Sequence, residues 1–161
     1  MKKVWIVLLC VLACGVVFAG GAKESAPSEA KSYVFAADAT WPPLEFIDEK
    51  GNLTGFEVEL MPAIGKEVGV TMTVKNIPWD TIFAGLANGA YDGVSSGVTV
   101  TEERKQTMDF STPILSNGQV VIIRAADKDK YASINDLSGK KTGVQIGTTG
   151  DFALADYPVV P

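Results

Sequence analysis

Three short apolar segments, alternating with two segments of helical periodicity, constrain the fold more than any other feature of the sequence. The apolar segments are residues 33–37, 70–77 and 91–95, each about the length of one buried strand. Residues 56–69 and about 80–88 lie between them. Strands that alternate with helices form a mainly parallel sheet with helices on its two faces. The sequence therefore predicts a doubly wound α/β fold.

Segment 56–69 is predicted to be an amphipathic helix, because apolar side chains recur close to every fourth residue. This apolar stripe consists of Phe56, Leu60, Ile64 and Val68. Most charged side chains of the segment, Glu57 among them, fall largely off the stripe. Pro62 lies inside the segment and is expected to kink the helix.

A polar loop precedes this helix. Residues 44–47 and 53–55 flank the loop 48–52, whose Asp, Gly and Asn residues are typical of a tight turn. We therefore expect a β-hairpin between the first strand and the first helix.

Polar and aromatic side chains follow each predicted strand at the point where it ends. Asp38 and Trp41 follow the first strand, Trp79 follows the second, and Ser96 and Gly97 follow the third. In doubly wound folds, ligands bind at the carboxyl ends of the parallel strands. The sequence therefore predicts a binding site at this edge of the sheet.

Residues 96–104 have the chemistry of an anion receptor. Ser96, Gly97 and Thr99 lead into a predicted short helix, whose first turn offers free N–H groups. Arg104 lies one turn into that helix, and its planar guanidinium can hold a carboxylate by two parallel hydrogen bonds. We interpret the segment as a carboxylate receptor.

A simpler interpretation of the same segment stays open. Thr101 could serve only as a helix cap and Gly97 only as a turn residue, while Arg104 pairs with Glu102 or Glu103 in solvent.

The two tryptophans also have two interpretations. Pro42 and Pro43 stiffen the loop after Trp41 and hold the indole away from the strand end. Such an indole is either packed in the core or forms a wall of a site, and Trp79 at a helix start has the same alternatives. As walls, the indoles would offer apolar and cation–π contacts. Asp38 could likewise only shape a turn.

Residues 1–19 have the organisation of a secretory signal peptide. A basic leader precedes the apolar run 4–17, which is too short for a membrane span, and small residues predict cleavage after Ala19. Residues 11–14 also resemble a loose lipoprotein box, which would place a lipid anchor at Cys14. We prefer soluble export, because residues 15–20 remain apolar; both alternatives predict an exported protein.

Composition excludes several classes of function. The chain is acidic, with a formal net charge of −5, and has no basic stripe that would suit nucleic acid or an anionic membrane. It has no histidine, and its cysteines, Cys10 and Cys14, both lie in the signal region, so we predict no metal site and no cofactor. Residues 20–32 are rich in small and charged side chains and are predicted to be a disordered linker.

The run SSGVTVTEERKQTMDFSTP, residues 95–113, resembles a signature of the periplasmic amino-acid-binding proteins of ABC transporters, family 3 of the bacterial extracellular solute-binding proteins. In that family a Gly-x-Thr-x-Thr-x-x-Arg segment holds the α-carboxylate of the ligand, and Gly97, Thr99 and Arg104 match it. The first strand of the family ends in Asp-x-x-aromatic-x-Pro-Phe-Glu-Phe. Asp38 matches this motif, with Trp41 in place of the usual Tyr or Phe.

The resemblance implies a periplasmic-binding-protein-like fold of two lobes, with a doubly wound sheet in each. Residues 33–118 would form lobe 1, residues 119–124 an interlobe crossover strand, and residues 125–161 the start of an incomplete lobe 2. A family member needs roughly a hundred further residues to finish this lobe. The chain would therefore be C-terminally truncated, and the acidic residue that binds the α-ammonium would lie beyond it.

Residues 118–149 carry the remaining local predictions. We expect strands at 118–124 and 140–145 and a short capped helix at 133–137. The turn IGTTGDF, residues 146–152, should open another helix, and it lacks the Gly-Lys-Ser/Thr ending of a phosphate loop. The resemblance implies that Thr149 in this turn is a second donor to the ligand carboxylate. It also implies that Gln145 and Trp79 contact the ligand.

The function implied by the resemblance is that of a periplasmic, monomeric receptor and not of an enzyme. It would capture a free amino acid between two lobes and deliver it to an ABC transporter permease in the inner membrane. Two alternatives use the same scaffold: an exported cyclohexadienyl (prephenate or arogenate) dehydratase-like enzyme with Asp38 or Glu45 as general acid, and the sensing module of a signalling receptor. The paired indoles and the aspartate favour a basic or polar side chain on the ligand.

Overall fold

The structure, a computed structural model, describes residues 31–159. The predicted signal peptide, its cleavage site, the alternative lipid anchor at Cys14 and most of the predicted linker lie outside the described residues. Among the described helices, none has the length and apolar character needed to cross a membrane.

A parallel sheet of three strands forms the centre of the fold. It consists of β5 (Thr71–Asn76), β1 (Ser32–Ala37) and β6 (Gly93–Val94), in that order. Phe35 in the middle of β1 pairs with Val74 on one side and with Gly93 on the other. The three predicted strands of the first half of the chain are therefore confirmed, and β1 occupies the central position.

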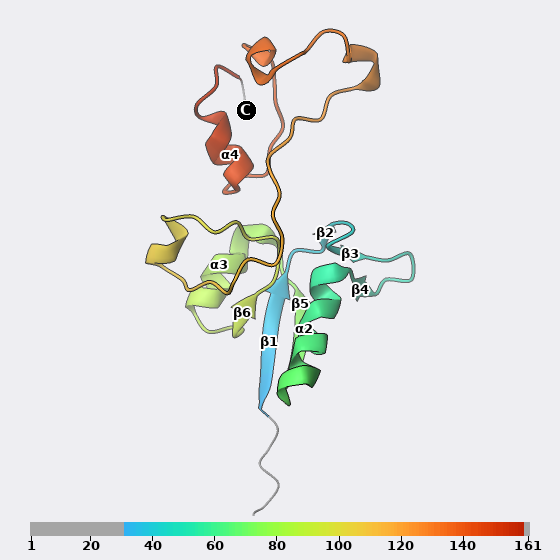
Figure 1. The fold of residues 1–161 in the computed structure, drawn as a ribbon, viewed down its shortest axis with the longest axis vertical. Helices are drawn as coiled ribbons and strands as arrows, with labels where there is room; N and C mark the ends of the chain where they lie inside the picture. Colours follow the sequence, from blue (N-terminus) through green and yellow to red (C-terminus); the bar gives the residue numbers. More distant parts are fainter. Residues whose placement is uncertain (1–30, 160–161) are drawn as a thin grey trace, which may run out of the picture. The chain divides into compact units, whose positions relative to one another are not determined.

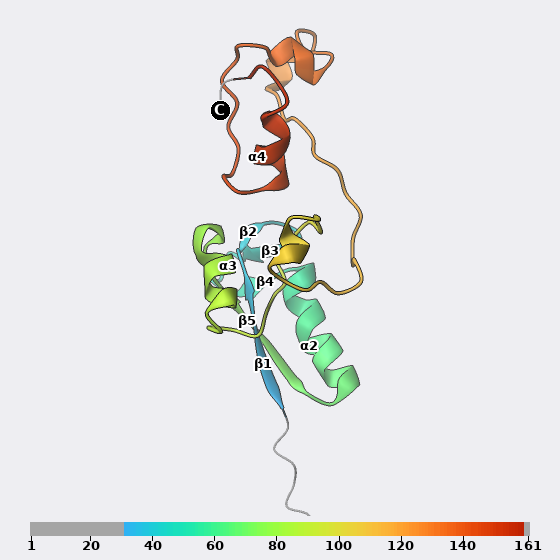
Figure 2. The same cartoon turned by 90° about the vertical axis from the view of Figure 1, so that its left-hand side faces the viewer.

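Two helices connect these strands and cover opposite faces of the sheet. Helix α2 (Phe56–Val68) links β1 to β5, and α3 (Trp79–Ala87) links β5 to β6. The chain moves outward across the sheet in the first crossover and back past β1 in the second. Right-handed crossovers that run in opposite directions across a sheet place their helices on different faces. Figure 1 and Figure 2 show α2 and α3 on opposite sides of β1, as expected for a doubly wound sheet.

The predicted hairpin belongs to a second, antiparallel sheet. Its strands are β2 (Thr40–Trp41), β3 (Glu45–Ile47) and β4 (Leu53–Thr54), with β3 in the middle. Asp48 holds the turn, because its carboxylate accepts the backbone N–H groups of Lys50 at 2.9 Å and Asn52 at 2.7 Å. Strand β2 was not expected, and it places Trp41 directly opposite Glu45.

The buried face of α2 differs from the predicted apolar stripe. Phe56, Ile64 and Val68 are exposed. The buried residues are instead Glu57, Val58, Met61 and Gly65. Gly65 explains this orientation, because a Cβ atom there would lie 2.8 Å from the carbonyl oxygen of Val70, so glycine lets the helix approach β5 closely. The predicted stripe is therefore not the buried face, and Glu57, which falls off the stripe, is buried. The helix continues through Pro62.

Residues 118–124 and 140–145 do not form the predicted strands. Only Lys141 takes part in an isolated bridge. A strand needs a neighbour that accepts and donates its backbone hydrogen bonds, and residues 31–159 supply none here. Val120 and Ile122 are accordingly 82% and 91% exposed.

Short helical turns complete the described chain. They are η1 (Arg104–Gln106), η2 (Ala125–Asp127) and η3 (Ile134–Leu137), followed by helix α4 (Thr149–Leu154). The Ser133 side chain and the Asp136 carboxylate form a reciprocal capping box on η3, which confirms the capped turn expected there. The boundaries of the two lobes stay a prediction.

Candidate functional site

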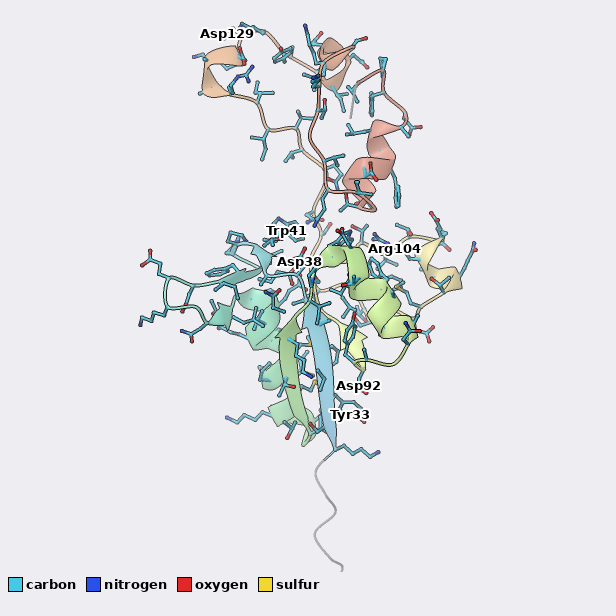
Figure 3. The ribbon with its side chains drawn as sticks, turned by 180° about the vertical axis from the view of Figure 1, so that it is seen from behind. Tyr33, Asp38, Trp41, Asp92, Arg104 and Asp129 are labelled. Carbon is cyan, nitrogen blue, oxygen red and sulfur yellow. The ribbon has the colours of Figure 1, made fainter. Side chains whose placement is uncertain are left out.

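All nine residues that the sequence singled out line one cleft of about 370 Å³. They are Asp38, Trp41, Trp79, Ser96, Gly97, Thr99, Arg104, Gln145 and Thr149. Figure 3 shows Asp38, Trp41 and Arg104 toward one end of β1, and Tyr33 and Asp92 toward the other. The cleft therefore lies where the parallel strands end, and its volume is in the range of small-molecule sites.

Arg104 is half-buried at this cleft. Its backbone N–H donates to Oγ1 of Thr101 at 3.1 Å, so Thr101 does cap the turn η1. The guanidinium donates through Nη1 to the carbonyl of Thr99 at 2.9 Å and through Nη2 to the carbonyl of Gly147 at 3.1 Å. These two hydrogen bonds fix the plane of the guanidinium.

Two aromatic rings flank the same guanidinium. The Cζ atom of Arg104 lies 5.8 Å from the ring centroid of Trp79 and 5.3 Å from that of Phe83, within cation–π range. Burial lowers the pKa of Arg104, while the negative charge of Glu103 raises it. The side chain stays positively charged, because the ordinary pKa of a guanidinium is far above neutral pH.

The alternative in which Arg104 pairs with a neighbouring glutamate is not what the structure shows. Glu102 pairs with Lys105 at 2.7 Å, and within residues 31–159 no carboxylate forms an ion pair with Arg104. A guanidinium has five N–H donors, and two of them are used here. The remaining donors leave Arg104 able to bind a carboxylate from a ligand.

Glu57 holds the segment at the end of β6. The N–H of Gly97 donates to both carboxylate oxygens of Glu57, each at 3.0 Å, and the hydroxyl of Ser95 donates to Oε2 at 3.2 Å. Glu57 is 2% exposed. The N–H of Gly97 is therefore already bonded to a carboxylate of the protein and is not free for an external anion.

Gly97 also supports an indole wall. Its φ of 54° lies in the left-handed region, and a Cβ atom there would fall 2.0 Å from Cζ3 of Trp41. Any other side chain would collide with the indole, so the glycine allows Trp41 to pack directly on the backbone.

A buried hydrogen-bond chain connects Asp38 to Glu45. The N–H of Asp38 donates to Oγ of Ser96 at 2.9 Å, and the hydroxyl of Ser96 donates to Oε1 of Glu45 at 2.8 Å. Glu45 is 1% exposed. Burial raises the pKa of Glu45 to about 8; Ser96 lowers it, and the negative charges of Glu57 and Asp38 raise it further. Glu45 is therefore largely protonated at neutral pH.

Gln145 in the turn before α4 and Thr149 at the start of α4 lie at the strand ends. Nε2 of Gln145 donates to Oδ2 of Asp38 at 3.2 Å. Oγ1 of Thr149 lies 3.3 Å from Oγ1 of Thr99 and accepts a hydrogen bond from Nε2 of Gln119 at 2.8 Å.

Trp79 makes a further contact with the same turn, since its Nε1 donates to the carbonyl of Ile146 at 3.2 Å. Thr148 caps α4 by accepting the N–H of Asp151. Residues separated by more than a hundred positions in the sequence thus share one network of polar contacts.

Sequence reasoning missed two residues of this network, Glu57 and Gln119, and it named Glu45 only as a general acid of the dehydratase-like alternative. The spacing of Glu57, Met61 and Gly65 at every fourth position is a signal that would have placed Glu57 on the buried face. Gln119 lies in an apolar run with no pattern that distinguishes it.

Known proteins resemble this chain in sequence and in fold. The probable histidine-binding protein of Neisseria gonorrhoeae is 42% identical over 165 residues, which cover 96% of this chain and 59% of that protein. The ancestral amino acid-binding protein AncCDT-1, a precursor of cyclohexadienyl dehydratase, has a TM-score of 0.74 and 37% identity, covering 78% of this chain and 56% of that one. A truncated ArgBP from T. maritima in its arginine-bound form has a TM-score of 0.73 and 37% identity, covering 80% and 62%.

The chain thus spans about three fifths of the length of these proteins. The match to a family covers most of the described residues, from 33 to 153. This match, together with the parallel sheet covered by helices on both faces and the cleft at its strand ends, assigns the fold. The chain belongs to the bacterial extracellular solute-binding proteins, family 3.

Proposed function

We propose that this protein is an exported receptor that binds a free amino acid in the cleft and delivers it to the permease of an ABC transporter. The observation that carries the proposal is the half-buried guanidinium of Arg104, which lines the cleft beside Trp79 without a carboxylate partner among residues 31–159. Partial burial of a cation without a counter-ion costs free energy, and an anionic ligand would relieve that cost.

The α-carboxylate of the ligand would bind the free donors of Arg104. The hydroxyls of Thr99 and Thr149, 3.3 Å apart, would provide further donors from two different parts of the chain. Gly97 would contribute space for Trp41 and not its N–H, because Glu57 already accepts that N–H.

The rest of the ligand would extend toward Asp38. The carboxylate of Asp38 and the amide of Gln145 would meet its polar or positively charged groups, and Ser96 would keep Asp38 in place. Trp41 and Trp79 would cover its apolar part.

The expected affinity is micromolar. A hydrogen bond to a charged group contributes about 1.5–3 kcal/mol, so three or four such bonds contribute about 4.5–12 kcal/mol, a range that includes the roughly 8 kcal/mol of a micromolar complex. The arrangement therefore needs no covalent step, and we propose that the protein binds its ligand without transforming it. We further propose a periplasmic, monomeric protein.

One observation favours a second candidate, the dehydratase-like enzyme. Glu45 lines the cleft and its raised pKa of about 8 keeps a proton available at neutral pH, which a general acid requires. The burial of Glu45 disfavours this role, since a ligand would have to reach a side chain that is 1% exposed. Incubation of the protein with prephenate and arogenate, followed by chromatography of the products, separates the two candidates.

Isothermal titration calorimetry with a panel of the common amino acids tests the proposal directly. We expect saturable binding of at least one of them, with a dissociation constant in the micromolar range or below. Correct folding is checked by a cooperative thermal transition of the same sample. A folded sample that binds no member of the panel contradicts the proposed function.

A further inference from the structure

Glu45 has one carboxyl oxygen that no protein group satisfies. Oε1 accepts the hydroxyl of Ser96, but Oε2 is buried and is the one buried side-chain polar atom without a hydrogen-bond partner among residues 31–159. Buried polar atoms are almost always paired, and an unpaired one destabilises the folded state. A buried carboxyl oxygen without a hydrogen-bond donor favours the neutral form of Glu45 in the free protein, because nothing stabilises a negative charge on Oε2.

Acidic groups surround this carboxyl. Asp38 approaches it from the end of β1 and Glu57 from α2, and both raise its pKa by their negative charge. Trp41 lies opposite Glu45 on β2, and Ser96 follows β6; neither carries a charge. No lysine or arginine of the described chain pairs with any of the three carboxyl groups. Asp38 and Glu45, which line the cleft, and Glu57, which lies behind its lining, therefore form no ion pair with a cation among residues 31–159.

We propose that Glu45 is a specificity-determining residue for ligands with a positively charged side chain, and that it releases its proton to solvent when such a ligand binds beside Asp38. The reaction is a simple ionisation, in which the O–H bond at Oε2 breaks, a carboxylate forms, and the buffer takes up the proton. The proposal rests on the proposed function, because it concerns the same cleft.

The physical reason is the local balance of charge. In the free protein, desolvation and two neighbouring negative charges keep Glu45 neutral. A ligand cation near Asp38 offsets that negative charge and stabilises the ionised form of Glu45. A neutral ligand side chain does not stabilise ionised Glu45. The ionised carboxylate therefore attracts a cationic ligand but not an uncharged analogue of the same shape.

Proton release makes the affinity depend on pH in a defined direction. Binding that releases a proton becomes tighter as the pH rises, by up to about tenfold per pH unit for one full proton, until the free protein has itself lost the proton near pH 8. Other side chains contribute little to the pH dependence of the affinity near neutral pH, because the chain contains no histidine, the residue that ordinarily titrates there.

The test is calorimetric titration of the whole chain with L-arginine at pH 7 in phosphate and in Tris, two buffers with different ionisation enthalpies. We expect the binding heat to differ between the buffers, which reports proton release. L-citrulline, which has the shape of arginine without its charge, should bind more weakly and with the same heat in both buffers.

The variant Glu45→Gln keeps the size of the side chain and cannot ionise. It should still bind arginine, but with equal heats in the two buffers and with an affinity that no longer rises from pH 6 to 8. If Glu45 were only structural, the variant would change the unfolding temperature and leave the buffer dependence intact.

Infrared difference spectra of the wild-type protein supply a measurement that needs no variant. Arginine binding should remove the carbonyl stretch of one protonated carboxyl group. Arginine binding with equal heats in both wild-type titrations and no loss of this band overturns the inference and leaves the proposed function standing. A folded chain that binds neither arginine nor any other amino acid overturns both.

Discussion

The backbone N–H of Gly97 lies 3.0 Å from each carboxylate oxygen of Glu57, so a side chain from α2 holds the loop at which β6 ends. The hydroxyl of Ser95 adds a third hydrogen bond to the same carboxylate. The position of the loop, and with it that of Ser96 and Thr99, therefore depends on a helix residue that does not itself line the cleft.

The variant Glu57→Gln tests this dependence. The amide has one accepting oxygen where the carboxylate has two, and its NH₂ group would meet the N–H of Gly97 or the hydroxyl of Ser95. We expect the free energy of unfolding to fall by about 1–3 kcal/mol. Urea denaturation followed by circular dichroism measures this change.

Glu67→Gln is the matched control, because Glu67 lies on the same helix and is exposed. It should change the free energy of unfolding by less than about 0.5 kcal/mol. Equal effects of the two variants would show that the contact between Glu57 and Gly97 does not stabilise the loop.

Gly97→Ala should destabilise the protein for two separable reasons. The left-handed backbone at φ 54° costs a residue with a Cβ atom about 1–2 kcal/mol, and the collision with Trp41 adds about 1–3 kcal/mol of overpacking. Gly51→Ala measures the cost of the left-handed backbone alone, because Gly51 has a φ of 84° and no atom lies within 4 Å of an added Cβ.

The difference between the two alanine variants in thermal or urea unfolding therefore measures the packing of Trp41 on Gly97. We also expect Gly97→Ala to change the tryptophan fluorescence, since the indole must move. Identical losses at positions 97 and 51 would contradict the close approach of the indole.

The edge of the sheet that carries the cleft was predictable because its causes are local in the sequence. Apolar runs at 33–37, 70–77 and 91–95 specify buried strands, and a parallel arrangement brings the residues that follow them together. Asp38 and Ser96, 58 positions apart, meet for this reason.

Other features depend on partners that local patterns do not identify. Helix α2 has apolar residues on two faces, and only the close approach that Gly65 permits decides which face meets β5. Residues 118–124 have the composition of a strand, but a segment of this composition becomes a strand only where a neighbouring strand pairs with its backbone N–H and C=O groups. The bonds that Glu57 forms with Gly97 likewise follow from tertiary packing.

Arg104→Ala should weaken amino-acid binding by about 3 kcal/mol, or roughly 100-fold, because it removes charge-assisted hydrogen bonds from the proposed carboxylate site. Arg104→Lys should recover only part of the loss, since an ammonium keeps the charge but lacks the planar fork. The measurement is calorimetric titration with whichever amino acid binds the wild-type protein.

Lys105→Ala serves as the control for this series. It removes one positive charge from the next residue, whose ammonium pairs with Glu102. We expect no change in affinity beyond twofold. Unchanged affinity in Arg104→Ala, in a sample that unfolds cooperatively, would exclude Arg104 from the binding site.

The stability of the protein without ligand should depend on pH through Glu45. Its pKa rises from 4.5 to about 8 on folding, so the folded state holds a proton that the unfolded chain has lost at intermediate pH. The stabilisation is fully present below about pH 4.5 and is lost as the pH rises through 8.

Glu45→Gln remains neutral throughout, so the unfolding temperature of the wild-type protein should fall relative to that of the variant between pH 5 and 9. Because other titrating groups are shared, they cancel in this comparison. If the unfolding temperatures of the two proteins differed by the same amount at every pH, Glu45 would have an ordinary pKa in the folded protein and its Oε2 would be solvated.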